Sequence, residues 1–541
     1  MTKTQKSIIG GVTILSVMGI IAKLIGIFFR IPLSNIIGGE GIGTYQLVFP
    51  TYTLLLQISS AGIPVAVSRL VSEHIARKDP AGALRTFRIA SRLLTALGVL
   101  SMLIMIFGSS LLSAMVADPE TRLGYIAIAP SLWMVCTMSA YRGFLQGRQK
   151  MGPTAYSQVI EQLGKVFVAL PLAALGASKG IAYGAAGALL GTSIVEGIAL
   201  LYMMFVKRRS MPEFSRLEQA ENTPSEATGK IIKKLVIIAI PITLSACIVP
   251  FAGQIDAAMI VNRLLTAGFD LPYSRNLYGL YSGIVIPLIN VPTALSIAIS
   301  LTLVPAISAA SARGDRRTLR RNTNTGLRFA FLVGFPCGLG LGMLAQPIIE
   351  MLYGAYSFGE QIAAANLLHI SAITIVLFTT VQATSSILQG LGRQYIPMYT
   401  LIAGVVVKIT LNYFLVVNPD INIFGAPLSS VACYTVSMVP NIYFCMKYTK
   451  TKFDFIALIV KPILATLIMG AALYGGMKLI GTGTIATILL IILAVVVYLA
   501  AIIVTGAMPR SEVHLLPAGR KLEKLMLKLR IYKRAEDESD D

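Results

Sequence analysis

The chain has 541 residues, of which 55% are hydrophobic and 13% charged, and its mean hydropathy is +0.74. Soluble domains carry about 25% charged residues, so this composition excludes an ordinary soluble protein and indicates a polytopic integral membrane protein. The net charge of +21 is explained by basic loops beside anionic lipid headgroups and needs no nucleic-acid partner. No polar stretch inside the chain is long enough for a catalytic domain, which argues against an enzyme.

Apolar runs long enough to cross a bilayer as helices, about 20 residues each, recur along the whole chain. They predict 14 spans, at 8–37, 44–72, 86–116, 123–145, 154–176, 181–206, 231–264, 277–310, 325–352, 362–389, 395–417, 423–447, 454–479 and 483–507. The first run lacks a small-residue cleavage site, so we expect it to stay as a helix. The fold class predicted is therefore an all-α polytopic membrane protein.

The basic residues predict the orientation of these spans. Most of the 46 Lys and Arg residues fall in loops on the side of the two termini, whereas the opposite loops hold Arg122, Lys179 and Arg275. Because cytoplasmic loops are enriched in Lys and Arg, we expect both termini to lie in the cytoplasm. The protein is expected in the plasma membrane of a bacterium.

Two segments are expected outside the helix bundle. Residues 207–230 end in a polar run and are interpreted as a flexible cytoplasmic linker. Residues 510–541 combine a basic amphipathic helix, with apolar residues at helical spacing between Arg520 and Arg534, and an acidic tail. Such a helix is expected to lie on the inner leaflet.

The chain also contains an internal duplication. Ala76-Arg-Lys-Asp79 recurs as Ala312-Arg-Gly-Asp315, and Phe144-Leu-Gln-Gly147 recurs as Ile387-Leu-Gln-Gly390. The common order of these matches predicts two pseudo-symmetric six-helix lobes, related by an axis along the membrane normal. The expected division is 1–206 for the first lobe, 231–448 for the second and 449–509 for a C-terminal helix pair.

Ionisable residues inside spans are functional candidates, because each costs at least about 2.5–3.5 kcal/mol to insert. The basic candidates are Lys23, Arg30, Lys165, Arg263 and Lys408, and the acidic candidates are Glu161, Glu196 and Asp256. The excess of cations favours an anionic substrate, since Arg and Lys are the usual partners of phosphate. We therefore predict a substrate site between the lobes that uses Lys23, Arg30, Arg263, Lys165 and Glu161.

Structural explanations compete with these assignments. Arg30 and Arg263 lie near span ends, where they could simply extend toward headgroups. Glu161 and Lys165 are four residues apart on one helix face, so they could form a structural pair. The five cysteines are widely spaced without a CxxC motif, so neither a zinc site nor a disulfide framework is indicated. No cofactor is expected, and coupling to the membrane potential, to protons or to sodium is left open.

Several stretches resemble one family, and together they cover nearly all of the chain. They are Ile37-Gly-Gly-Glu-Gly-Ile-Gly-Thr-Tyr45, Ile63-Pro-Val-Ala-Val-Ser-Arg-Leu-Val71, Tyr141-Arg-Gly-Phe-Leu-Gln-Gly147, Met151-Gly-Pro, Gln158-Val-Ile-Glu-Gln162 and Val304-Pro-Ala-Ile-Ser308. The chain is similar to the multidrug/oligosaccharidyl-lipid/polysaccharide exporter superfamily, in the stage V sporulation protein B-like branch that includes MurJ-type lipid II flippases.

The resemblance implies a 14-helix flippase that exports an undecaprenyl-pyrophosphate-linked glycan, such as a peptidoglycan or polysaccharide precursor. It places Lys23 and Arg30 at the polar end of the family's first helix. A monomer in contact with anionic lipids is expected. The alternative function is a multidrug exporter of the same superfamily, coupled to sodium or protons, and a membrane scaffold is a third, non-transport alternative.

A last expectation concerns Asp256 on span 7 and Lys408 on span 11. Some relatives are expected to hold sodium between these helices, whereas here Lys408, with Asn412 one turn later, offers an ammonium group instead. We predict that Asp256 and Lys408 form an internal ion pair, which would keep the buried carboxylate charged. The alternative is that Lys408 faces the central cavity and binds phosphate.

Overall fold

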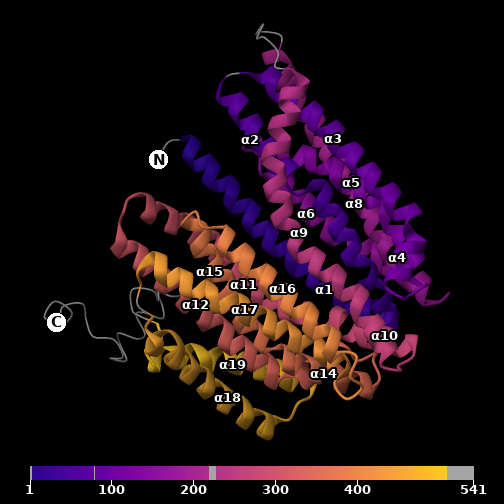
Figure 1. The fold of residues 1–541 in the computed structure, drawn as a ribbon, viewed down its shortest axis with the longest axis vertical. Helices are drawn as coiled ribbons and strands as arrows, with labels where there is room; N and C mark the ends of the chain where they lie inside the picture. The colour runs from indigo at the N-terminus through magenta and orange to yellow at the C-terminus, as the bar shows by residue number, and fades with distance from the viewer. Residues whose placement is uncertain (1–2, 78, 219–226, 452, 509–541) are drawn as a thin grey trace, which may run out of the picture. The chain divides into compact units, whose positions relative to one another are not determined.

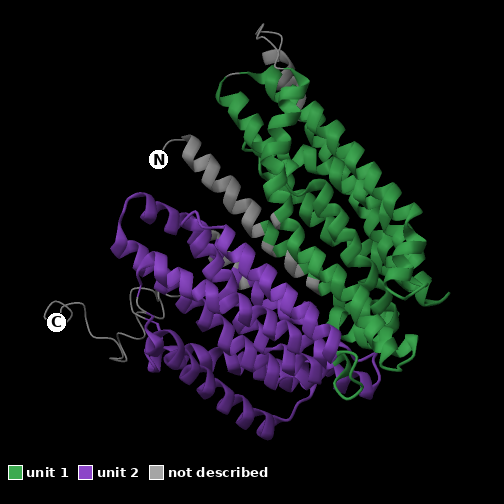
Figure 2. Cartoon of the chain, viewed as in Figure 1, with its two compact units in different colours: residues 1–284, 416–423 green, residues 285–415, 424–541 purple. Residues whose placement is uncertain are grey.

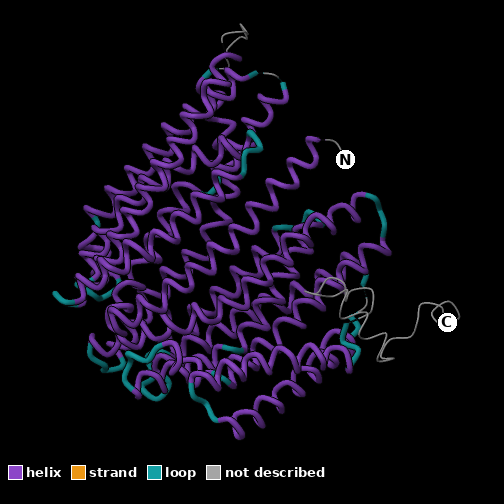
Figure 3. The backbone as a smooth tube through the Cα atoms, turned by 180° about the vertical axis from the view of Figure 1, so that it is seen from behind, coloured by secondary structure: helices purple, strands orange, loops and turns teal. Residues whose placement is uncertain are grey.

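The structure is a computed structural model that describes all residues except 1–2, 78, 219–226, 452 and 509–541. The described residues form helices joined by short loops, and no strand occurs among them (Figure 3). Helices suit this apolar chain because a helix satisfies its backbone hydrogen bonds internally, where no water is available. The all-α prediction is confirmed.

Thirteen helical stretches among the described residues are long and apolar enough to cross a membrane. They follow the order of the predicted spans, and the first stretch, Phe28–Ala76, contains the end of the first predicted span and the whole of the second. Helix α1 (Lys3–Ser60) is broken inside that stretch at Gly38, whose φ of 70° and ψ of −179° are not helical. The break lies between residues 37 and 44, where the sequence predicted the end of one span and the start of the next.

Gly38 occupies a backbone region that is essentially restricted to glycine, so its replacement is expected to strain the chain. We expect Gly38→Ala to lower stability by about 1–3 kcal/mol, although no atom would touch the added methyl group. The measurement is the melting temperature of the purified protein in detergent. Gly475→Ala is the matched control, because that glycine is helical and its added methyl group also meets open space. Equal melting temperatures for the two variants would contradict the conclusion that the backbone at residue 38 requires glycine.

The chain divides into two compact units (Figure 2). The first unit comprises residues 1–284 and 416–423, and the second comprises 285–415 and 424–541. The helices up to the unit boundary are α1, α2 (Ile63–Ala76), α3 (Pro80–Phe107), α4 (Ser109–Met115), α5 (Thr121–Gly147), α6 (Gly152–Gly164), η1 (Lys165–Ala169), α7 (Leu170–Ala177), α8 (Ile181–Glu218), α9 (Thr228–Thr266), α10 (Leu271–Gly279) and η2 (Leu280–Val285).

The remaining helices are labelled in Figure 1 where there is room. They are α11 (Ile286–Ala312), α12 (Arg316–Met343), α13 (Ala345–Leu352), α14 (Phe358–Ser371), α15 (Ile373–Gly390), α16 (Tyr395–Leu415), η3 (Asn422–Phe424), α17 (Gly425–Thr449), η4 (Ile456–Val460), α18 (Lys461–Ile480) and α19 (Thr484–Val504).

Helix α5 is central to the first unit, where it packs against α2, α3 and α8. Its buried side chains include Tyr125, Leu132 and Phe144. In the second unit α12 packs against α11, α15 and α18. Helix α19, the last helix among the described residues, is joined to α12 by the Tyr498 hydroxyl, which donates to the Leu332 carbonyl at 2.7 Å.

The duplicated motifs have the same local structure in both copies. Helices α2 and α11 end at Ala76 and Ala312, and the aspartate three residues later caps the next helix in each case. Asp79 accepts a hydrogen bond from the Gly82 N–H at 2.7 Å, and Asp315 accepts one from the Thr318 N–H at 3.0 Å. The hydrogen bonds from Thr318 hold the pKa of the Asp315 carboxyl below its usual value. The duplication therefore specifies equivalent helix junctions.

The predicted linker, residues 207–230, is helical at both of its ends. Helix α8 continues to Glu218 and α9 begins at Thr228, whereas 219–226 lie outside the described residues. The predicted amphipathic helix and acidic tail in 510–541 also lie outside them. Helices α9 and α10 pack against α1 within the first unit. The lobe boundaries at 206, 231, 448 and 509 stay a prediction.

Candidate functional site

Arg30 is a half-buried cation on the kinked helix α1. Its guanidinium carbon lies 5.8 Å from the centroid of the Phe49 ring, a cation–π distance. Among the described residues no carboxylate lies within ion-pair distance of Arg30. This part of the site therefore presents a positive charge that the described part of the chain does not neutralise.

The other predicted residues of the first unit lie on α1 and α9. Lys23 falls in α1, but its side chain is outside the part of the chain that the structure describes. Arg263 lies in the last turn of α9, and Asp256 lies two turns earlier on the same helix. Both side chains are half-buried.

Lys408 and Asn412 lie on α16 in the second unit. Lys408 is half-buried, and Asn412 is buried. The Ser429 hydroxyl of α17 donates to Asn412 Oδ1 at 2.5 Å, so Asn412 helps to join α16 to α17. Because Asp256 and Lys408 belong to different units, their pairing stays a prediction.

Four ionisable side chains inside the first unit form what we call the charge cluster: Arg142 of α5, Glu161 of α6, Lys165 of η1 and Glu196 of α8. Arg142 is ion-paired with Glu161. Its Nε and Nη2 also donate to the Ser157 hydroxyl at 3.0 and 2.7 Å. Lys165 Nζ lies 4.0 Å from Glu196 Oε1. Glu161 and Lys165, predicted as one pair or as phosphate ligands, thus each have a partner on another helix.

Close helix packing brings Lys165 beside Glu196. A methyl group on Gly164 would lie 2.5 Å from the Val195 side chain, and one on Gly191 would lie 2.3 Å from the Ala169 backbone. The chain also changes at Lys165 from α-helix to the π-helical turn η1, a feature that is frequent at functional sites. Glycine at these contacts therefore allows two charged side chains to meet between helices.

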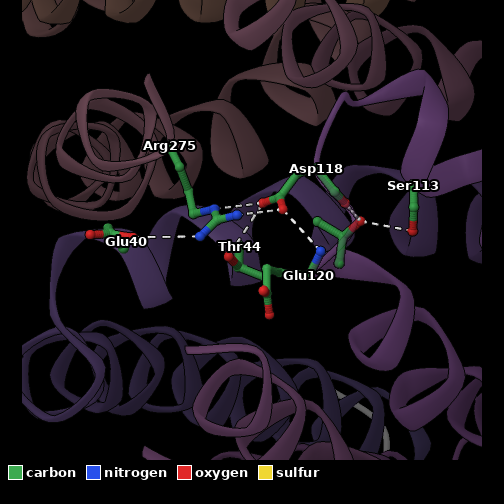
Figure 4. Close-up of polar contacts among 7 residues, drawn as sticks. Glu40, Thr44, Ser113, Asp118, Glu120 and Arg275 are labelled. Carbon is green, nitrogen blue, oxygen red and sulfur yellow. Dashed lines mark hydrogen bonds and ion pairs between the residues drawn. The ribbon is translucent and has the colours of Figure 1, made fainter. Parts of the chain in front are cut away.

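A second polar centre lies where α1, α10 and the segment between α4 and α5 meet (Figure 4). Arg275 donates to both carboxylate oxygens of Asp118, from Nε at 2.8 Å and from Nη2 at 2.7 Å. Its Nη1 lies 3.5 Å from Glu40, and the Thr44 hydroxyl lies 3.4 Å from Asp118. The Asp118 side chain is fully buried, and that of Arg275 is 6% exposed. Such a bidentate pair fixes the geometry of the helices that carry it.

Two small-residue motifs face each other next to this ion pair. They are Gly39-Glu-Gly-Ile-Gly43 of α1 and Gly279-Leu-Tyr-Ser-Gly283 of α10 and η2. A methyl group on Gly279 would lie 2.2 Å from the Gly39 carbonyl, and one on Gly43 would lie 2.3 Å from the Arg275 carbonyl. GxxxG spacing allows this backbone approach in membrane helices. We call this contact the α1–α10 seam.

The sequence prediction did not assign roles to Arg142, Asp118, Glu40 or Arg275. A signal for Arg275 was present, because it is one of few basic residues outside the basic loops. The glycines around Glu40 were noticed only as part of a family resemblance, and their packing role was missed. Glu196 was recognised as a charge inside a span, but its partner was not.

The described part of the chain thus combines apolar helices of membrane length with buried ion pairs, and carries no cluster of three or more His, Cys, Asp or Glu side chains that could hold a metal. These features define the class as a multi-span membrane protein with charged groups inside its bundle. The family described as "Polysaccharide biosynthesis protein" matches residues 8–311, and the MatE family matches residues 282–414. The first match covers more than half of the chain.

Relatives extend this match over nearly the full length. The chain is 27% identical to stage V sporulation protein B of Bacillus subtilis over 79% of this chain and 81% of that protein. It is 25% identical to the lipid II flippase MurJ of the same organism over 88% and 89% of the two chains. A solved structure of lipid II flippase MurJ in an inward closed conformation superposes with a TM-score of 0.66 at 15% identity, covering 90% of this chain and 97% of the other.

The chain belongs to the polysaccharide biosynthesis protein family, in the stage V sporulation protein B and MurJ branch of the MOP exporter superfamily. The family predicted from the sequence is confirmed. A multi-pass membrane protein of flippase or exporter type follows from this membership and from the apolar helices.

Proposed function

We propose that the protein is a flippase that moves an undecaprenyl-pyrophosphate-linked glycan, such as lipid II, from the inner to the outer leaflet. The observation that carries this proposal is the similarity to a lipid II flippase over 88% of the chain. The orientation that fits this role has both termini in the cytoplasm of a bacterial cell, as the basic loops predict.

The charges of the first unit support an anionic substrate. The charge cluster contains two cations and two carboxylates, so its net charge is zero when all four groups are ionised. Arg30 has no such partner among the described residues. A guanidinium can bind a diphosphate through two parallel charge-assisted hydrogen bonds. We assign Arg30 the principal phosphate contact, with Lys23 and Arg263 as further candidates on α1 and α9.

We also propose the pairing of Asp256 with Lys408, with Asn412 beside it. An ammonium group would then fill the place of a sodium ion, and transport would need no sodium at that position. The MatE match to residues 282–414 supports the alternative function, a multidrug exporter. Cationic drugs require an acidic site, whereas the charge cluster has no net charge and Arg30 has no carboxylate partner in the part of the chain that the structure describes.

The test is complementation of a bacterium that is depleted of its lipid II flippase. We expect the wild-type chain to restore growth and Arg30→Ala to lose most of this activity, because charge-assisted phosphate contacts are about twice as strong as neutral ones. Arg30→Lys should retain part of the activity, since it keeps the charge but loses the planar fork. Expression of each variant is followed by immunoblot.

Arg122→Ala is the matched control, because Arg122 is an exposed arginine in the first turn of α5. Full growth with Arg30→Ala would reject Arg30 as the phosphate contact. Failure of the wild-type chain to restore growth, together with resistance to cationic drugs in the same cells, would favour the multidrug exporter.

A further inference from the structure

The two halves of the charge cluster are not equivalent. One half is the pair of Arg142 and Glu161, in which Arg142 also donates two hydrogen bonds to Ser157. The other half is the pair of Lys165 and Glu196. Glu196 is the most deeply buried member, with a side chain that is 6% exposed. Its Oε1 lies 4.0 Å from Lys165 Nζ, and its Oε2 has no hydrogen-bond partner among the described residues.

A charged carboxylate in this position would lack the bonds that normally stabilise it. An isolated ionised carboxylate is costly to bury unless it is paired and hydrogen-bonded, and 4.0 Å is longer than the usual charge-assisted hydrogen bond of about 2.7–2.9 Å. A bound proton or cation would supply the compensation that this geometry lacks. The Glu161 carboxyl is also close enough to interact with Glu196 electrostatically. Its negative charge makes a second negative charge on Glu196 still more costly.

The groups around Glu196 favour a proton over a metal ion. The titratable or charged side chains that act on it come from four elements: Tyr52 of α1, Arg142 of α5, Glu161 of α6 and Lys165 of η1. Two of these four are cations, and they would repel a metal ion. A metal ion would need space and further oxygen ligands, whereas a proton needs neither. The tight contact between Gly164 and Val195 leaves little space beside Glu196.

We propose that Glu196 is a proton-binding site inside the first unit, and that the uptake and release of this proton accompany transport. Lys165 is a positioning residue that compensates the carboxylate when the proton has left. The proton site uses none of the three residues proposed to contact phosphate, so its spectroscopic test does not depend on which substrate is transported.

The direct test is infrared difference spectroscopy of the purified full-length protein in liposomes, titrated over a wide pH range. A protonated carboxyl in an apolar setting gives a resolved C=O band that shifts in deuterated water. We expect this band to change with pH in the wild type and to be lost in Glu196→Gln. Glu196→Asp should keep a titrating band, because it keeps the carboxyl, with an altered midpoint.

Glu73→Gln is the matched control, because Glu73 lies in an exposed ion pair with Arg69 on α2. It should leave the band unchanged. Glu161→Gln tests the neighbouring carboxyl and should alter the midpoint without removing the band. Size-exclusion profiles and melting temperatures verify that each variant is folded.

Three results would overturn the proposal. The first is a titrating band of wild-type size in Glu196→Gln. The second is a band in the wild type that responds to sodium chloride at constant pH, which would indicate a sodium site. The third is unchanged pH dependence of growth in complemented cells that carry Glu196→Gln. If Glu196→Gln does not fold, an unaltered midpoint in Glu196→Asp would overturn the proposal in its place.

Discussion

Replacing Asp118 by alanine is expected to lower the free energy of unfolding by about 3–5 kcal/mol, the usual effect of removing one partner from a buried ion pair. Asp118 is fully buried and accepts two hydrogen bonds from Arg275, at 2.7 and 2.8 Å. Among the described residues, its loss would leave the buried guanidinium with the more distant Glu40, at 3.5 Å, as its remaining carboxylate. The measurement is the melting temperature in detergent.

Two variants give this prediction its control. Asp420→Ala removes an exposed aspartate from another loop and should change the melting temperature little. The double variant Asp118→Ala/Arg275→Met removes both charges and should recover part of the loss, since the largest cost is the uncompensated charge. A double variant less stable than Asp118→Ala would show that the ion pair is not the cause.

Gly279→Ala is expected to open the α1–α10 seam. The added methyl group would lie 2.2 Å from the Gly39 carbonyl and 2.8 Å from the Gly43 N–H nitrogen. Both are backbone atoms, so they can move away only if one helix moves. Inserting a methyl group into a packed contact costs about 1–3 kcal/mol, and we expect the upper part of that range because no side chain can adjust. The melting temperature measures this loss.

Gly197→Ala is the matched control for the seam. Its added methyl group would lie 3.3 Å from the sulfur of Met134, and a flexible methionine can move aside. We expect little or no loss of stability. If Gly279→Ala proved as stable as Gly197→Ala, the close approach of α1 and α10 would not be needed for folding.

Much of the fold was predictable because the controlling signals are local. An apolar run predicts a spanning helix whatever surrounds it, and the spans predicted from hydropathy match the helices of the structure in order. The change of direction near Gly38 was also predictable, because Gly38 and Gly39 interrupt an apolar run. The recurring Asp79 and Asp315 were recognised as a repeat, and each caps a helix.

The candidate site was only partly predictable. Glu161 and Lys165 were recognised as charges inside one span, and their spacing of four residues suggested a pair. In the structure Glu161 bonds to Arg142, which lies 19 residues away on α5, and Lys165 lies beside Glu196 on α8. The helix period alone could not predict this, because partners on neighbouring helices compete with those one turn away.

The sequence by itself determined the class of protein, the family and the order of the apolar helices among the described residues, because hydropathy and short motifs are read along the chain. Only the tertiary structure decided which charges meet. Asp118 and Arg275 are 157 residues apart and form a bidentate pair, and the glycines of the α1–α10 seam bring the two backbones together. A charged side chain pairs with the oppositely charged group that helix packing brings within about 3 Å of it. How closely two helices pack depends on the side chains of both helices, which lie far apart in the sequence.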